Sequence, residues 1–252
     1  MHNTVIHAPL TSPTILADIG CGTGIITTKL STLHPNAERV FGIDISPVPT
    51  HQNKGGNVEF IQGDIRRLAG TDPRLRLGSL DFVFNRLLIC GMTDWPGYVR
   101  EVAALLRPGG WAEMQDCAYV WYLNGKVCSD EWAWMKALRE GAERKGMDLD
   151  CGRNIKGYME DAGFVDVQVL EYRFPWWTEG AEGREETRKL SEHAINEWWR
   201  LWWHLIPKMV DGLGYGKGDI EDLQNDLKER TKAEVGKEMT FYSTFGRKPE
   251  AD

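Results

Sequence analysis

A glycine turn between an apolar stretch and a helical pattern is the feature that most constrains this chain. The turn, Asp18-Ile19-Gly20-Cys21-Gly22-Thr23-Gly24, follows the apolar residues 15–17 and leads directly into a helical pattern that starts at Ile25. A strand, a glycine turn and a helix in this order predict the site where an open α/β sheet binds a nucleotide-like ligand. An ordinary strand-to-helix turn is the simpler alternative.

The spacing of the glycines indicates which ligand this turn suits. A dinucleotide-binding turn needs a third glycine at the position where Ile25 stands, and the acidic Asp18 would repel a nearby phosphate. A ligand with positive charge and no phosphate fits better, and S-adenosylmethionine, which carries an ammonium and a sulfonium, is such a ligand. We expect Asp18 to meet the ammonium, and the ligand to lie against the turn at Gly20, Cys21, Gly22 and Gly24.

The pattern after the turn predicts a parallel sheet. Strand and helix signals alternate from residue 14 to about residue 110, as a parallel sheet requires. The predicted fold class is therefore α/β, with a Rossmann-like, seven-stranded, mostly parallel sheet that is flanked by helices and carries helical lid insertions. The predicted strands are 15–19, 40–43, 58–62, 80–84, 111–115, 164–170 and 239–245.

The 252 residues suit one domain with an inserted lid better than two independent domains. The predicted division is a cofactor-binding core at 14–116, helical lid or substrate segments at 117–162 and 176–236, and last strands at 164–172 and 239–247. We expect helices at 94–106, at 130–145 with a cap at Ser129, at 155–162, at 185–206 ending before Pro207, and at 220–233 with a cap at Asp219.

Acidic residues end the second and third predicted strands. Asp44 is placed to accept hydrogen bonds from ribose hydroxyls, and Asp64 to accept one from the adenine amino group. Ile45 and Ile65 would then sandwich the adenine ring. Asp44 could equally belong to a turn and Asp64 to a helix cap. Asn85 ends the fourth strand in the crevice where such sheets bind ligands, and we include it among the cofactor contacts.

These motifs, in this order, resemble class I S-adenosylmethionine-dependent methyltransferases, and several stretches resemble the fungal LaeA-like group. The resemblance implies S-adenosylmethionine as methyl donor and S-adenosylhomocysteine as product, with many relatives acting in secondary metabolite biosynthesis; the name-giving member is a nuclear regulator. Relatives usually carry several dozen helical residues before the first strand, where this sequence has about a dozen. The resemblance to the LaeA-like group rests on residues 18–24, 41–47, 85–88, 94–96, 106–115 and 242–249.

Several residues are candidates for the acceptor side. Arg86 follows Asn85 and is either a substrate contact or a structural ion-pair partner, and Tyr119 and Trp121 follow the fifth strand. In the helix after Glu185, one face carries His193, Glu197, Arg200 and His204. This row is either solvated, or supplies His193 or His204 as a general base.

The opposite face of that helix is apolar. An apolar stripe at helical spacing would pack the helix, line a pocket for an apolar or aromatic small molecule, or form a homodimer contact. The stripe consists of Leu190, Ala194, Trp198, Leu201, Trp202, Leu205 and Met209, with Trp176, Trp177, Trp199 and Trp203 as further candidate pocket residues.

Composition excludes several classes of function. A net charge of -7 argues against nucleic-acid binding, and the sequence has neither an apolar run long enough for a membrane span nor a signal peptide. The five cysteines form no C-x-x-C pair and no metal-ligand spacing, which favours reduced thiols, no metal and a cytoplasmic location, with a nuclear one left open.

The sequence thus predicts a methyltransferase that acts on a small-molecule natural product. One alternative is a non-catalytic regulatory module that binds the cofactor and a protein partner. Another is a cyclase that uses the bound sulfonium only electrostatically.

Overall fold

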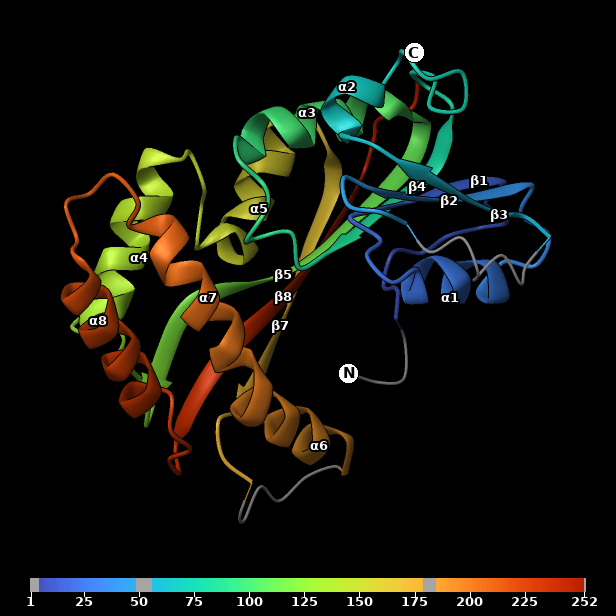
Figure 1. Cartoon of the computed structure of the whole chain (residues 1–252). Coiled ribbons are helices and arrows are strands. Elements are labelled where there is room, and N and C mark those ends of the chain that lie inside the picture. Colours follow the sequence, from blue (N-terminus) through green and yellow to red (C-terminus); the bar gives the residue numbers. More distant parts are fainter. Residues whose placement is uncertain (1–4, 49–55, 179–184, 252) are drawn as a thin grey trace. The chain divides into compact units, whose positions relative to one another are not determined.

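The computed structural model describes residues 5–48, 56–178 and 185–251, which group into two compact units (Figure 1). The first unit contains the described residues up to 116 together with 151–170 and 242–251. The second contains 117–150 and the described part of 171–241. The predicted core at 14–116 lies within the first unit. The helix expected at 155–162 was assigned to the lid, but it also belongs to the first unit.

The sheet has the order β3-β2-β1-β4-β5-β8-β7, with the short β6 paired to β5. The pairings β1–β2, β1–β4, β2–β3 and β4–β5 are parallel, and the β5–β6 hairpin is antiparallel. The strands are β1 (Ile15–Ile19), β2 (Arg39–Asp44), β3 (Val58–Gln62), β4 (Leu80–Arg86), β5 (Leu106–Leu123), β6 (Lys126–Val127), β7 (Val165–Pro175) and β8 (Lys237–Arg247).

The strand order reverses beside β1, because β2 and β3 lie on one side of it and β4 on the other. Such a switch point opens a crevice at the carboxyl ends of the strands, where open α/β sheets bind ligands. The predicted α/β fold with seven principal strands is confirmed. The β6 hairpin was not predicted. The fifth strand was predicted to begin at 111, because residues 107–110 contain the Pro and Gly typical of a turn, but these residues belong to β5.

Helices of the first unit cover this sheet. Helix α1 (Ile25–Leu33) contacts β1, β2 and β3, and its Leu30 is buried among apolar side chains that include Leu16, Val40 and Phe82. Helix α3 (Trp95–Leu105) contacts α5 (Cys151–Asp161). As predicted, α3 begins after Asp94, whose carboxylate accepts a hydrogen bond from Gly97 N.

The second unit packs three helices around tryptophan rings. Helices α4 (Ala133–Arg144), α7 (Trp199–Met209) and α8 (Lys217–Arg230) contact one another, and α6 (Glu185–His193) precedes α7. Trp121 has no exposed surface, and its ring centroid lies 5.0–6.0 Å from those of Trp132, Trp134, Trp176 and Trp202. Most of the rings expected to line a pocket therefore pack against each other.

The long helix expected at 185–206 is interrupted by a π-helical turn, η1 (Ala194–Trp198). A π turn adds one residue to the helix, so residues eight apart share a face instead of residues seven apart. Ala194 is buried and so is Trp202 at 1% exposure, whereas Leu201 is 53% exposed. Beyond the π turn the predicted stripe is confirmed at Trp202 and Met209, is wrong at the exposed Leu201, and omitted the buried Ile206.

Pro207 does not end this helix, contrary to the prediction, but lies inside α7. Proline has no N–H and leaves the carbonyl four residues earlier without its helical donor. That carbonyl belongs to Trp203, and it accepts a hydrogen bond of 2.9 Å from Gln224 Nε2 on α8. A neighbouring helix therefore satisfies the group that the proline leaves free.

Two predicted helix caps are also wrong. Helix α4 starts after Trp132, and Ser129 instead uses its hydroxyl to accept a hydrogen bond from Trp121 N. Helix α8 starts at Lys217, so Asp219 lies within its first turn, where its carboxylate accepts a hydrogen bond from Gly216 N. Among the described residues, no helix is sufficiently long and apolar to cross a bilayer.

Candidate functional site

The first unit contains a cavity of about 260 Å³ at the carboxyl ends of β1, β2 and β3. Four segments line it: the start of the glycine turn, the end of β2, the start of α2 (Ile65–Leu68), and the loop after β4. Their lining residues are Ile19, Gly20, Ile43, Asp44, Ile45, Gly63, Asp64, Ile65, Arg66, Leu87, Leu88, Gly91 and Met92.

The glycine turn has the backbone that its sequence predicts. Gly20, Gly22 and Gly24 have φ values of 71°, 50° and 75°, a left-handed conformation that favours glycine. Gly20 N and Cys21 N both donate to the carbonyl of Ile43, which ties the turn to β2. A Cβ at Gly20 would overlap the Leu88 side chain, so this position also needs glycine for its close approach to the loop after β4.

Asp44 is held in place at the tip of β2. One carboxylate oxygen accepts a hydrogen bond of 2.8 Å from Gly22 N, and the other accepts one of 2.8 Å from Ser46 N. The carboxylate therefore bridges the glycine turn and the residues after β2. Each oxygen keeps a lone pair for a further donor, as a ribose diol would require.

Asp18 lies beneath the glycine turn at 2% exposure, and Thr27 Oγ1 donates a hydrogen bond of 2.7 Å to it. Burial raises the pKa of Asp18 to about 6, while the Thr27 hydrogen bond and the charge of Arg86 oppose the rise. A nearby cation would favour the ionised form. Burial likewise raises the pKa of the Cys21 thiol to about 12, so this thiol is neutral at pH 7.

Asp64 combines the two roles that the sequence left open. Its carboxylate caps α2 by accepting a hydrogen bond of 3.0 Å from Arg66 N, and the residue also lines the cavity. Arg66 reaches from α2 to the loop after β4, where its Nη1 donates to Thr93 Oγ1 at 3.2 Å. Sequence analysis missed Arg66, because this contact joins residues that are 27 positions apart.

The loop after β4 is fixed by a buried carboxylate that the sequence analysis did not identify. Leu88 N and Ile89 N donate to Asp116 Oδ2 at 2.8 Å and 3.0 Å, and Asp116 has no exposed surface. Leu87 has a φ of 57°, which turns the chain sharply after the strand. This arrangement places Leu88 against the glycine turn, where it forms part of the cavity wall.

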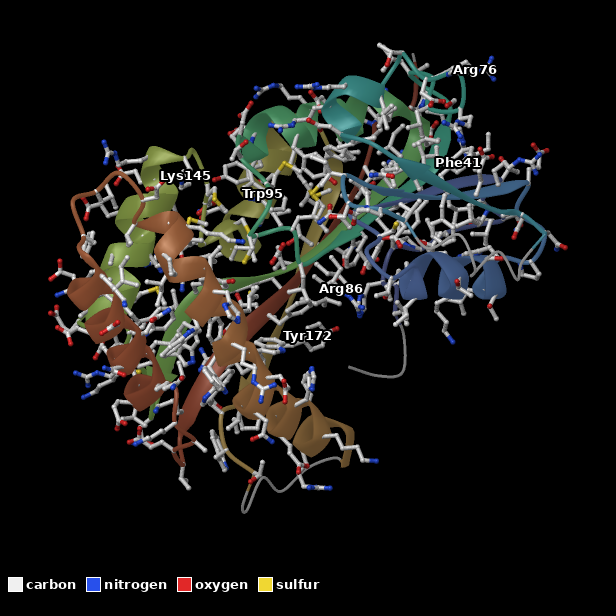
Figure 2. The ribbon with its side chains drawn as sticks, viewed as in Figure 1. Phe41, Arg76, Arg86, Trp95, Lys145 and Tyr172 are labelled. Atoms are coloured by element: carbon white, nitrogen blue, oxygen red, sulfur yellow. The ribbon has the colours of Figure 1, made fainter. Side chains whose placement is uncertain are left out.

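Asn85 and Arg86 occupy the end of β4 as predicted. Asn85 is fully buried and accepts a hydrogen bond of 3.1 Å from Tyr98 Oη, whereas its Nδ2 has no partner among the described residues. The Asn85 side chain does not line the cavity, so a contact with the cofactor remains a prediction for it. Arg86 is exposed and forms no ion pair among the described residues (Figure 2).

The remaining candidates belong to the second unit. Tyr119 and Trp121 lie in the aromatic core, and the buried Trp121 Nε1 has no hydrogen-bond partner among the described residues. His193 is exposed at the end of α6, and His204 is exposed on α7. In the polar row that contains them, Arg200 Nη1 is 2.9 Å from Glu197 Oε2. Their roles remain predictions. No group of three or more metal-ligating side chains occurs among the described residues.

Comparison with known proteins identifies a methyltransferase domain in the first unit. Residues 17–114 match the family model described as "Methyltransferase domain". The methyltransferase pytC of Aspergillus terreus is 29% identical over 163 residues, which cover 64% of this chain and 48% of pytC. The secondary metabolism regulator LAE1 of Pyricularia oryzae is 26% identical over 174 residues, which cover 67% of this chain and 53% of LAE1.

The chain thus spans about half the length of these curated relatives. Among solved structures, phosphoethanolamine N-methyltransferase 2 of Haemonchus contortus, in complex with S-adenosyl-L-methionine, has a TM-score of 0.57 and 17% identity, covering 96% of this chain and 50% of that one. This likeness shows the fold. The match at 17–114 includes the glycine turn and the ends of β2, β3 and β4, so the methyltransferase resemblance predicted from the sequence is confirmed for this part of the chain: residues 17–114 form a methyltransferase domain.

Proposed function

We propose that this chain is an S-adenosylmethionine-dependent methyltransferase that transfers a methyl group to a small-molecule natural product by in-line displacement. The observation that carries the proposal is Asp44, whose two carboxylate oxygens are oriented by Gly22 N and Ser46 N at the edge of the cavity. The pytC and phosphoethanolamine N-methyltransferase names support methyl transfer as the class of reaction.

The residues of the first unit fit the cofactor. Asp44 would bind the ribose hydroxyls, and Asp64 the adenine amino group, with Ile45 and Ile65 on the two sides of the ring. Asp18 would meet the ammonium. The backbone at Gly20, Cys21, Gly22 and Gly24 would lie against the amino-acid half, and Asn85 completes the proposed contacts. S-adenosylmethionine supplies an already activated methyl group, so the main task of the protein is to align donor and acceptor.

The acceptor side is proposed to include Arg86, Tyr119 and Trp121, with His193 as the base for a hydroxyl acceptor. The unpaired Nε1–H of Trp121 supports a polar contact there. A positioned base contributes roughly 10²–10⁴-fold when the acceptor proton is hard to remove, and a thiol or amine acceptor could react without one. We further propose an apolar or aromatic acceptor and a cytoplasmic location.

The test combines binding with turnover. The purified chain should bind S-adenosylhomocysteine and should transfer label from methyl-labelled S-adenosylmethionine to at least one compound in a panel of fungal metabolites. Asp44→Ala should weaken binding roughly 10-fold to 100-fold, because it removes a charged hydrogen-bond acceptor. Glu38→Ala, which removes an exposed carboxylate near the other end of β2, should bind as the wild type does. Unchanged binding by Asp44→Ala would contradict the proposal.

A regulatory module is the second candidate, and the LAE1 relative favours it, because that protein is named as a regulator. The half-buried Trp199 and Trp203 offer a surface for a protein partner or for a second copy of the chain; their rings lie 6.0 Å apart, with Lys228 Nζ 4.1 Å from the Trp203 ring. Binding of S-adenosylhomocysteine without transfer to any acceptor, together with a stable partner, would favour this candidate.

A further inference from the structure

Arg86 is a cation to which the described residues offer no ion-pair partner. It ends β4, directly before the cavity-lining Leu87 and Leu88, and its guanidinium forms no hydrogen bond or ion pair among the described residues. Most other arginines of the first unit are paired: Arg74 with Asp72, Arg107 with Asp81, and Arg247 with Asp166. The sequence left open a structural ion pair for Arg86, and no such pair forms among the described residues.

The sheet register places Arg86 beside the glycine turn. Asp18 pairs with Phe84 and Ile19 pairs with Asn85 across β1 and β4, so the next position on β4, Arg86, is level with Gly20. Side chains alternate along a strand, and paired residues of neighbouring strands point to the same face. Arg86 therefore leaves β4 on the same face as Asp18, whose side chain contacts Thr27 of α1.

The surroundings of Arg86 are short of negative charge. Although part of the Arg86 side chain is exposed, partial burial of its guanidinium lowers the pKa of Arg86, and the charge of Asp18 opposes this shift. Asp18 forms no ion pair with Arg86 among the described residues, because its buried carboxylate accepts a hydrogen bond from Thr27 instead. The first residue of α1, Ile25, follows Gly24 with no side-chain cap, so the positive end of the helix adds to the same region.

From these observations we infer that Arg86 binds a carboxylate in the loaded site, which rests on the proposed function. A guanidinium presents paired donors that match the two oxygens of a carboxylate. Two sources could supply that group next to Gly20: the methionine half of the cofactor, or an acidic acceptor. In the first case Asp18 and Arg86 would bind the opposite charges of one amino-acid zwitterion.

Calorimetry on the full chain tests this inference with two probes that differ in the group at issue. S-adenosylhomocysteine carries the amino-acid carboxylate, and 5′-methylthioadenosine lacks the amino-acid half. If the cofactor supplies the carboxylate, Arg86→Gln should weaken S-adenosylhomocysteine binding roughly 10-fold to 100-fold. It should change 5′-methylthioadenosine binding less than about twofold. Arg86→Lys should restore part of the lost affinity, because lysine keeps the positive charge but lacks the paired donors of a guanidinium.

If an acceptor supplies the carboxylate, Arg86→Gln should bind S-adenosylhomocysteine normally. Wild-type protein saturated with S-adenosylhomocysteine should then bind benzoate more tightly than the neutral benzamide, and Arg86→Gln should lose that preference. Arg76→Gln is the matched control, because Arg76 is an exposed arginine of the same unit that lies well away from Arg86 (Figure 2). This variant should behave as wild type with every probe.

Two results would overturn the inference. In one, Arg86→Gln matches wild type with S-adenosylhomocysteine, and the wild-type preference for benzoate is either absent or unaffected by the substitution. In the other, Arg86→Gln weakens both nucleosides equally, which indicates general damage to the cavity. If the wild-type chain itself bound neither nucleoside, the proposed function would fail first, and the inference with it.

Discussion

At the scale of single residues, the protonation of Asp18 is expected to control cofactor affinity. Because burial raises the pKa of Asp18 to about 6, the carboxyl is mostly neutral at pH 5 and mostly ionised at pH 7. A cationic ammonium binds the ionised form better. The affinity for S-adenosylhomocysteine should therefore rise roughly tenfold from pH 5 to pH 7, as measured by calorimetry at both values.

Asp18→Asn supplies the control for this prediction. The amide can still accept the Thr27 hydrogen bond but does not titrate, so its affinity should be lower at pH 7 and nearly the same at pH 5 and pH 7. The folded state also favours protonated Asp18, so wild-type stability should decline relative to this variant as the pH rises from 4 to 7. An equal pH dependence in the two proteins would show that another group is responsible.

At the scale of elements, the π turn decides which face of α7 is buried. Trp202→Ala removes a ring that is 1% exposed, so it should reduce the free energy of unfolding by roughly 3–5 kcal/mol. Leu201→Ala removes a side chain that is 53% exposed and should cost less than about 1 kcal/mol. Urea denaturation of both variants measures the difference. A straight α-helix through 194–209 would predict the reverse ranking.

Gly141 shows packing overriding helix propensity. It lies inside α4, where Ala would normally be favoured by roughly 1 kcal/mol, but a Cβ there would overlap the carbonyl of Met209 at the end of α7. Gly141→Ala should therefore destabilise the protein by about 1–3 kcal/mol.

Gly157, in α5, has open space around its Cβ position, and it serves as the matched control. Gly157→Ala should raise the free energy of unfolding by roughly 0.5–1 kcal/mol. Thermal and urea unfolding of the two variants should thus change in opposite directions. A gain in stability from Gly141→Ala would mean that α4 and α7 are farther apart than in this structure.

At the scale of the whole molecule, one buried carboxylate joins segments that are far apart in the sequence. Glu113 on β5 accepts hydrogen bonds from His7 N and Ala8 N, at 2.7 Å and 2.9 Å, and from Ser243 Oγ on β8 at 2.8 Å. Although its burial opposes ionisation, the hydrogen bonds from the His7 side chain, Ala8 N, the Gln115 side chain and His7 N lower the pKa of Glu113.

Glu113→Gln should therefore lose roughly 1.5–3 kcal/mol of stability at pH 7, because charged hydrogen bonds to two distant segments, at 7–8 and at 243, are weakened together. The ionised form stabilises the fold above the ordinary glutamate pKa, and this contribution is lost as the pH falls through the lowered value. The difference from wild type should thus shrink at pH 3.5 in urea denaturation. Glu38→Gln, at an exposed carboxylate, should show no such difference.

Structural features that depend only on residues close together in the sequence could be predicted. The three glycines of the turn, and the acidic residues that end β2 and β3, each depend on neighbours within a few positions, and the structure places Asp44 and Asp64 around one cavity. The parallel sheet followed from the same local alternation. The capping role of Asp64, left open as an alternative, proved compatible with its place in the cavity wall.

Features that depend on distant partners could not be predicted. Pro207 continues a helix because Gln224, 17 residues later, satisfies the carbonyl that the proline leaves free. Asp116 supports Leu88, and Arg66 reaches Thr93, through contacts between segments whose proximity only the fold creates. The π turn leaves no signature in the apolar pattern, because Leu201 and Trp202 are both apolar.

The position of β8 between β5 and β7 has a consequence for the way the protein is made. The ribosome synthesises β7 before β8, so β7 cannot reach its place beside a neighbour until the later strand has emerged. Nascent chains that stop before Lys237 should accordingly present an unfinished sheet edge to chaperones.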